Sequence, residues 1–75
     1  MVKVLYFGIA REITGKAAEE LEAHDTAGLR HLLNVSYPEK RSVPFRLALN
    51  GSLLREETTL ENGDKIAVLP PFAGG

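Results

Sequence analysis

The sequence predicts an α+β domain in which a mixed sheet wraps around one main helix. Three observations point to this class. Runs rich in β-branched and aromatic residues lie near both ends (residues 2–9 and 65–69), one amphipathic helical segment follows Asp25, and an Asn50-Gly51 pair separates two short apolar runs. The chain has 75 residues, enough for one small domain. We expect residues 1–75 to form a single domain, with residues 70–75 as a flexible C-terminal tail.

The first strand is expected at residues 2–9, because a run this short and this rich in β-branched and aromatic residues favours a strand over a helix. Lys3 marks one face of the strand as the solvent side, and Leu5 and Phe7 share that face. The opposite face, directed at the core, carries Val2, Val4 and Tyr6. Residues 10–14 are expected to form one helical turn that Gly15 ends.

Residues 16–23 are ambiguous between helix and strand. The segment is rich in Ala and Glu, which favour a helix, but its apolar spacing does not make a helical face. A helix is expected to begin at Asp25-Thr26, where either side chain can cap free backbone N–H groups. Tyr37-Pro38 would end this helix. Its apolar face would contain Leu29, Leu32 and Leu33.

The second half of the chain predicts a hairpin followed by a final strand. Residues 45–49 alternate as a strand, Asn50-Gly51 is a strong signal for a two-residue hairpin turn, and residues 52–54 would form the short return strand. After a turn at residues 62–64, the last strand covers residues 65–69. The helix makes the connection long enough for the last strand to lie parallel to the first. This order of elements is that of the β-grasp, or ubiquitin-like, fold.

The composition excludes several classes of function. Nine basic and ten acidic residues give a net charge of −1, so we expect neither nucleic acid nor a membrane as a partner. The absence of cysteine excludes disulfides, thiolate catalysis and Cys-based zinc sites. His24 and His31 have no matching ligands nearby in the sequence, so no metal site is expected. The N-terminus does not resemble a signal peptide, which makes the cytoplasm the expected location.

The chain ends in Leu69-Pro70-Pro71-Phe72-Ala73-Gly74-Gly75. Gly74 and Gly75 have no Cβ atoms, so they can thread a narrow channel and place the terminal carboxylate inside another protein. Pro70 and Pro71 would end the preceding strand and stiffen the tail. Fully extended, the four residues after Pro71 would reach about 13 Å. The alternatives are a frayed end or a cloning remnant.

Three segments carry a resemblance to a known family: residues 4–12 (VLYFGIARE), residues 60–68 (LENGDKIAV) and residues 69–75 (LPPFAGG). Together they resemble the small subunit of molybdopterin synthase, a ubiquitin-like sulfur carrier with a C-terminal Gly-Gly. The two prolines separate this chain from the carrier of the thiamine pathway, which usually lacks them. The resemblance implies that residues 16–23 form a weak second strand paired with the first.

The resemblance also implies a chemistry. An activating enzyme would use ATP to adenylate the carboxylate of Gly75, sulfur would replace AMP to give a thiocarboxylate, and a large synthase subunit would receive this sulfur on a cyclic pyranopterin. Two small and two large subunits would form a heterotetramer. The chain alone would be non-catalytic, a subunit of a heteromeric sulfurtransferase with no permanently bound cofactor. Because the chain has no cysteine, the terminal carbonyl carbon is the only plausible carrier of sulfur. Because it has no phosphate-binding loop, the ATP site is expected in the partner.

Strand parity suggests where partners bind. Leu5, Phe7, Ala67 and Leu69 would form an exposed apolar patch on neighbouring strands, and such patches mark interfaces; the alternative is that these residues are core. Arg11 either contacts an acidic partner or caps its turn, and Arg46 and Lys65 either lie near the tail or are solvated strand charges. We expect the partner-binding residues to be Leu5, Phe7, Arg11, Leu69, Pro70, Pro71 and Phe72.

Two other functions remain open on the residues alone. A ubiquitin-like protein modifier would use the same fold and the same Gly-Gly end to form an isopeptide bond with lysines. A sulfur carrier for thiamine synthesis or tRNA thiolation would use the same thiocarboxylate. Pro70 and Pro71 favour the molybdopterin carrier over the modifier, and the metal held by the final cofactor is not specified by the sequence.

Overall fold

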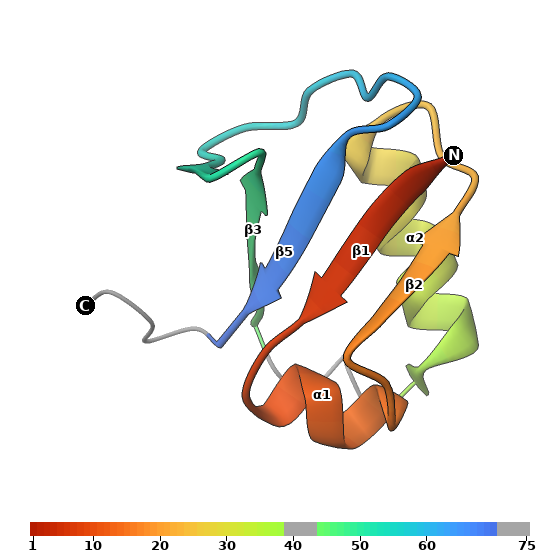
Figure 1. Cartoon of the computed structure of the whole chain (residues 1–75), viewed down its shortest axis with the longest axis vertical. Coiled ribbons are helices and arrows are strands. Elements are labelled where there is room, and N and C mark those ends of the chain that lie inside the picture. The colour runs from red at the N-terminus through yellow and green to blue at the C-terminus, as the bar shows by residue number, and fades with distance from the viewer. Residues whose placement is uncertain (39–43, 71–75) are drawn as a thin grey trace.

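The computed structural model describes residues 1–38 and 44–70, which form one five-stranded sheet and two helices (Figure 1). The elements, in chain order, are β1 (Val2–Tyr6), α1 (Ile9–Thr14), β2 (Ala18–Leu21), α2 (Thr26–Ser36), β3 (Arg46–Leu49), β4 (Ser52–Leu53) and β5 (Lys65–Leu69). Their order in the sheet is β2-β1-β5-β3-β4. The predicted α+β class, a mixed sheet wrapped on one main helix, is confirmed.

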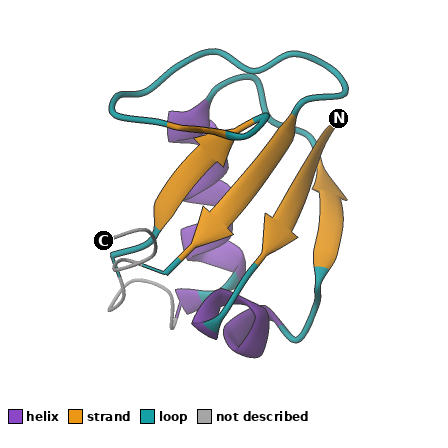
Figure 2. Ribbon diagram, turned by 60° about the vertical axis from the view of Figure 1, so that its left-hand side comes forward, coloured by secondary structure: helices purple, strands orange, loops and turns teal. Residues whose placement is uncertain are grey.

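The centre of the sheet is the parallel pair β1–β5, in which Val4 lies opposite Ile66 and Tyr6 opposite Val68. The outer strand pairs β1–β2, β5–β3 and β3–β4 are all antiparallel. The two central strands come from opposite ends of the chain, and α2 crosses one face of the sheet between them (Figures 1 and 2). The expected parallel pairing of the first and last strands is therefore confirmed.

The core lies between α2 and the face of the sheet that α2 covers. Alternation along the strands sends every second side chain into it, as the sequence predicts. Leu29 and Leu33 of α2 are completely buried, while Leu32 is only half-buried. The strand residues of this core are Val2, Val4, Tyr6, Leu47, Ile66 and Val68, each no more than 2% exposed.

Helix α2 begins where the sequence predicts a cap. The Asp25 carboxylate accepts a hydrogen bond from the Gly28 N–H at 2.7 Å, which satisfies one of the free N–H groups of the first turn. Thr26 is completely buried, and its hydroxyl donates to Glu57 at 2.7 Å and accepts from the Thr58 N–H at 2.9 Å. These bonds attach the irregular segment after β4 to the start of α2.

The first strand is shorter than predicted. It was expected to reach Ile9, but β1 ends at Tyr6 and Ile9 begins α1. The physical reason is Gly8, whose φ of 58° and ψ of −131° turn the chain out of the strand into α1. Gly15 ends α1 in a left-handed conformation, as predicted. The return strand β4 likewise ends one residue early, at Leu53.

Four residues of the ambiguous segment 16–23, Ala18–Leu21, form the edge strand β2, antiparallel to β1. One side chain attaches it to the rest of the molecule. The Glu19 carboxylate accepts hydrogen bonds from the hydroxyl of Tyr6, from the hydroxyl of Tyr37 at 2.8 Å, and from Lys16 Nζ at 3.0 Å. The rings of Tyr6 and Tyr37 also pack edge to face, with centroids 6.2 Å apart. Glu19 thus joins β2 to β1 and to the end of α2.

These contacts shift the pKa values of Glu19 and Tyr6. Burial alone would raise the pKa of Glu19, but the hydrogen bonds from Tyr6, Tyr37 and Lys16 bring it below its ordinary value. Burial and the nearby Glu19 carboxylate raise the pKa of Tyr6, so this hydroxyl keeps its proton and remains a donor. The ionised form of Glu19 is therefore stabilised by folding.

Glu19→Gln should reduce the acid sensitivity of the fold. A carboxyl whose pKa is lowered by folding contributes stability that is present above its ordinary pKa of 4.5 and is lost as the pH falls through its folded-state value. We expect the free energy of unfolding of the wild type to fall more steeply below that pH than that of the variant, measured by urea denaturation across a pH series. Glu20→Gln, an exposed neighbour on the same strand, is the matched control. Identical pH profiles for all three proteins would contradict this role of Glu19.

Candidate functional site

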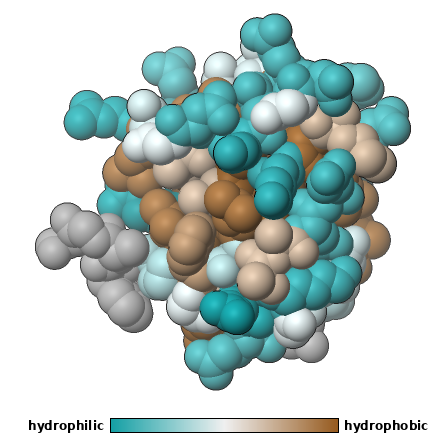
Figure 3. Space-filling view, viewed as in Figure 1, coloured by the Kyte–Doolittle hydropathy of each residue, from teal (hydrophilic) through white to brown (hydrophobic). Residues whose placement is uncertain are grey.

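The face of the sheet that α2 leaves uncovered carries a row of apolar side chains across all five strands. Leu5 lies opposite Ala18 on one side and Ala67 on the other, and Ala48 lies opposite both Ala67 and Leu53. We name this surface the outer face and the row the apolar row, with members Ala18, Leu5, Ala67, Ala48 and Leu53. Figure 3, which looks onto this face, shows hydrophobic side chains gathered across its middle with hydrophilic ones around them.

A hollow lies in the middle of the outer face. Its floor is the opposed pair Ala48 and Ala67, because two methyl side chains side by side leave the sheet surface uncovered. Leu5 and Phe7 border the hollow from β1 and the residue after it, and the turn after β3 borders it from the other direction. The residues around the floor are Leu5, Phe7, Asn50, Gly51 and Lys65.

The turn that borders this hollow is fixed by its backbone conformation and by side-chain hydrogen bonds. Asn50 and Gly51 both have positive φ, 48° and 92°, as a two-residue hairpin turn requires. The Asn50 side chain also donates to the Asp64 carboxylate at 3.1 Å and accepts from the Lys65 N–H at 2.9 Å. These bonds hold the β3–β4 turn beside the start of β5.

The predicted patch residues lie on the outer face. Leu5, Ala67 and Leu69 are half-buried, and Phe7 is 46% exposed. Phe7 is held at this position because its N–H donates to the carbonyl of Val68 at 3.2 Å. The structure therefore brings Phe7 next to the end of β5, where the chain continues toward its terminus.

The end of β5 and the start of α1 meet at one end of the sheet. Pro70 is half-buried and packs against Gly8: a Cβ atom at Gly8 would lie 2.7 Å from Pro70 Cγ. Arg11 is an exposed residue of α1, and Figure 1 shows α1 at the end of the sheet where β1 and β5 end. The remaining predicted site residues, Pro71, Phe72, Gly74 and Gly75, lie outside the described residues.

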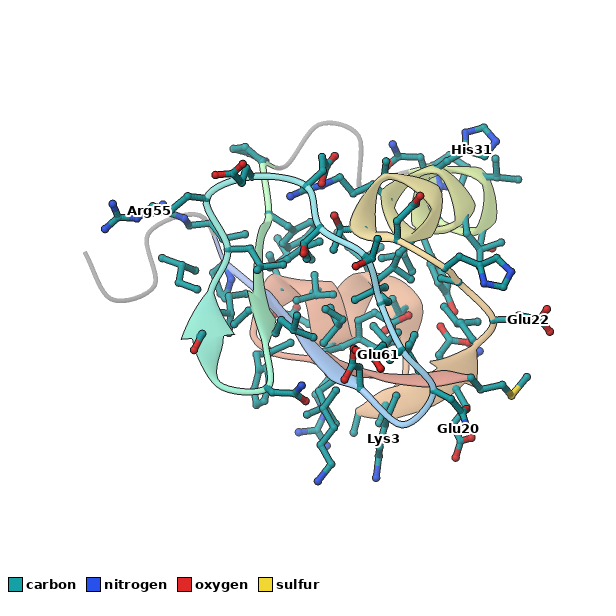
Figure 4. All side chains as sticks on the ribbon, turned by 90° about the horizontal axis from the view of Figure 1, so that it is seen from above. Lys3, Glu20, Glu22, His31, Arg55 and Glu61 are labelled. Carbon is teal, nitrogen blue, oxygen red and sulfur yellow. The ribbon has the colours of Figure 1, made fainter. Side chains whose placement is uncertain are left out.

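Charged side chains border the outer face. Lys3 lies opposite Glu20 on β2 and opposite Lys65 on β5, and Figure 4 shows Lys3 and Glu20 pointing away from α2. Arg46 lies opposite Leu69, at the end of the sheet where β5 ends. Lys65, at the other end of β5, is not beside the tail. Of Arg46 and Lys65, the two cations that the sequence suggested near the tail, only Arg46 lies at the end of the sheet where β5 ends.

The described residues do not contain a metal-binding cluster. Residues 1–38 and 44–70 include no group of three or more His, Asp or Glu side chains placed to hold a metal ion, and both histidines are exposed. None of the helices within those ranges is long and apolar enough to cross a membrane. What the outer face offers chemically is an apolar contact surface bordered by charged side chains of both signs, Lys3 and Glu20 among them.

Sequence patterns had not identified the hollow itself. Ala48 was not among the candidate residues, although its position in β3 puts it on the outer face. The sequence offers one signal for the hollow: alanine occurs at an outward position in β3 and again in β5. Only the strand register shows that these two alanines are neighbours.

Comparisons with known proteins agree with this geometry. The model of the ThiS family matches residues 4–75. The chain is 35% identical to a molybdopterin synthase sulfur carrier subunit from Chlamydomonas reinhardtii, over 99% of this chain and 98% of that protein.

Two solved structures are similar over almost the whole chain. One is a complex of subunits 1 and 2 of molybdopterin-converting factor from Helicobacter pylori, with a TM-score of 0.75 and 34% identity over 99% of this chain and 97% of that chain. The other is small archaeal modifier protein 1 from Methanosarcina acetivorans, with a TM-score of 0.84 and 28% identity over 99% of this chain and 95% of that chain.

Alanine at two adjacent positions should separate core from surface. Tyr6 is 2% exposed and Phe7 is 46% exposed. We expect Tyr6→Ala to lose about 3–5 kcal/mol of folding free energy, as large aromatic truncations in cores do, and Phe7→Ala to lose less than about 1 kcal/mol. Thermal and urea denaturation of both variants would measure this. A Phe7→Ala protein as unstable as Tyr6→Ala would show that Phe7 is part of the core.

Proposed function

Because the chain belongs to the ThiS family, we propose that it is the sulfur carrier of molybdenum cofactor biosynthesis and the small subunit of molybdopterin synthase. The observation that carries the proposal is that the outer face and the segment leading to the C-terminus meet at one end of the sheet. The exposed apolar outer face reaches Leu69, Pro70 follows it against Gly8, and the Gly-Gly terminus is only a few residues further along the chain. A docking surface and a terminal carboxylate are thus joined by a short connection.

The proposed chemistry takes place at Gly75. A carboxylate oxygen attacks the α-phosphorus of ATP bound to an activating enzyme, and pyrophosphate leaves. A sulfide-level donor then attacks the carbonyl carbon, AMP leaves, and a thiocarboxylate remains. Two such sulfur atoms, one from each of two thiocarboxylates, are transferred to a cyclic pyranopterin on the large synthase subunit to form the dithiolene of molybdopterin, and water restores the Gly75 carboxylate each time. Gly74 and Gly75 suit this role because, without Cβ atoms, they fit a narrow channel.

We propose that the carboxylate of Gly75 is the group through which the chain takes part in the chemistry. The chain has no cysteine to hold a persulfide, and the described residues include no metal-binding cluster. We therefore propose that ATP is bound by the activating enzyme and that the pyranopterin is bound by the large subunit. Cytoplasmic location is part of the same proposal, since ATP for the activation is abundant there.

The proposed docking surface is the outer face together with the end of β5. Leu5, Phe7 and Leu69 supply the apolar contact, and Arg11 lies on α1 at the same end. Pro70, Pro71 and Phe72 would guide the tail into the partner. The related Helicobacter pylori complex contains a subunit 1 and a subunit 2, which supports a large-subunit partner here, and we propose a heterotetramer of two small and two large subunits.

The protein-modifier function is the weaker candidate. The likeness to small archaeal modifier protein 1 rests on the same fold, which a carrier and a modifier share. The sequence relative from Chlamydomonas reinhardtii, at 35% identity over the full length, is a molybdopterin synthase sulfur carrier subunit. Recovery of this chain joined through Gly75 to lysines of other proteins would favour the modifier.

Deletion of Gly75 should abolish sulfur loading without affecting the fold. We expect intact mass spectrometry of the wild type, purified from its own host, to show the mass gain that replaces one oxygen atom with sulfur. The variant lacking Gly75, and a variant extended by one residue, should show no such gain and no product with the large subunit, yet have the melting temperature of the wild type. Normal molybdopterin formation by either variant would contradict the proposal.

Phe7→Ala should weaken docking. An aromatic side chain in a desolvated patch typically contributes about 2 kcal/mol or more to binding, so we expect roughly thirtyfold weaker affinity for the large subunit. Calorimetric titration would measure the affinity, and thermal melting would verify that the variant is folded. Val35→Ala, an exposed apolar residue on α2 away from the outer face, is the control. Wild-type affinity in a folded Phe7→Ala protein would remove Phe7 from the docking surface.

A further inference from the structure

The hollow in the outer face has the form of a socket. Its floor is only as high as the methyl groups of Ala48 and Ala67, whereas Leu5 and Phe7 stand higher beside it. A flat partner surface would leave this space empty, and empty space at an interface loses dispersion contacts. A side chain that projects from the partner would fill it.

The residues around the hollow indicate which kind of partner side chain would fill it. The floor and one side of the hollow are apolar, so the part that enters is apolar. The border at the start of β5 is Lys65, and Lys3 lies directly opposite Lys65 on the neighbouring strand. Neighbouring strands are about 4.8 Å apart, so two ammonium-bearing side chains start from adjacent positions at one edge of the hollow.

Lys3 and Lys65 form no salt bridge within residues 1–38 and 44–70, although Glu20 lies opposite Lys3 on the side away from Lys65. The salt bridges among those residues join Lys16 to Glu19 and Arg30 to Glu57, and neither includes Lys3 or Lys65. Like charges on opposed strand positions destabilise a sheet. The molecule nevertheless places them together on the outer face, although its net charge is −1. Carboxylates on a partner would offset that repulsion.

We propose that the hollow over Ala48 and Ala67 receives one apolar side chain of the large synthase subunit, and that Lys65 and Lys3 pair with carboxylates beside that side chain. The inference rests on the proposed function and adds the kind of surface the large subunit presents: an apolar projection with acidic residues on one side of it. The outer face then defines the orientation of docking, because the cations lie at the opposite end of β5 from the tail.

Filling the hollow tests the apolar part. In Ala67→Leu a larger side chain occupies the socket, and we expect calorimetric titration against the purified large subunit to show roughly thirtyfold weaker binding. Ala48→Leu fills the same space from the neighbouring strand and serves if the first variant does not fold. Ala27→Leu is the matched control, since Ala27 is an exposed residue of α2, on the opposite side of the sheet from the outer face. Its effect should stay below about fivefold.

Charge reversal tests the acidic part. We expect the affinity of the wild type to fall as salt is raised from about 0.1 to about 1 M, where the screening length shrinks from about 10 to about 3 Å. Lys65→Glu and Lys3→Glu should bind more weakly at low salt and lose or invert this dependence. Arg55→Glu, an exposed charge that does not border the hollow, should keep the wild-type dependence. Salt-independent binding of the wild type would overturn the charge pairing.

The outcomes separate this inference from the function on which it rests. If the wild type acquires a thiocarboxylate and delivers sulfur while folded Ala67→Leu and Ala48→Leu bind the large subunit normally, the socket is wrong and the function stands. If those variants instead fail only with the activating enzyme, or change only the self-association of the chain in sedimentation, the assignment to the large subunit is wrong. A wild type that never acquires a thiocarboxylate overturns both.

Discussion

The parallel pairing of β1 and β5 is the constraint on which the rest of the molecule depends. It places Val4 beside Ile66 and Tyr6 beside Val68 on the core face, and by the same alternation it places Leu5 beside Ala67 on the outer face. A shift of one residue in this register would exchange the two faces. The core, the hollow and the position of Pro70 next to Gly8 therefore follow from one strand alignment.

The edge strand β2 shows how tertiary contacts override local preference. Its Ala- and Glu-rich sequence favours a helix, and edge strands have only one neighbour to hold them. Glu19 compensates through hydrogen bonds with Tyr6, Tyr37 and Lys16, which come from β1, from the end of α2 and from the turn before β2. The same charged edge limits pairing with other chains. The segment is thus a strand because of residues that lie outside it.

Much of the architecture could be predicted from the sequence because its signals are local. The alternation in residues 2–6 and 65–69 identified the faces correctly, and Gly15 and Asn50-Gly51 marked turns that the structure contains. What the sequence did not predict has two kinds of cause. The end of β1 depends on the backbone conformation of Gly8, which its residue type permits but does not require. The hollow needed the register of β3 against β5, which no single segment encodes.

The position of β5 has a consequence for how the molecule is made. This strand lies between β1 and β3 in the sheet, yet it follows both of them along the chain. A nascent chain that lacks it holds two separate hairpins with no central strand between them, so the sheet can close only after β5 has been synthesised. Contacts that span nearly the whole chain also slow folding relative to local ones. Any partner that recognises the outer face would therefore select chains synthesised through β5, and incomplete products would be ignored.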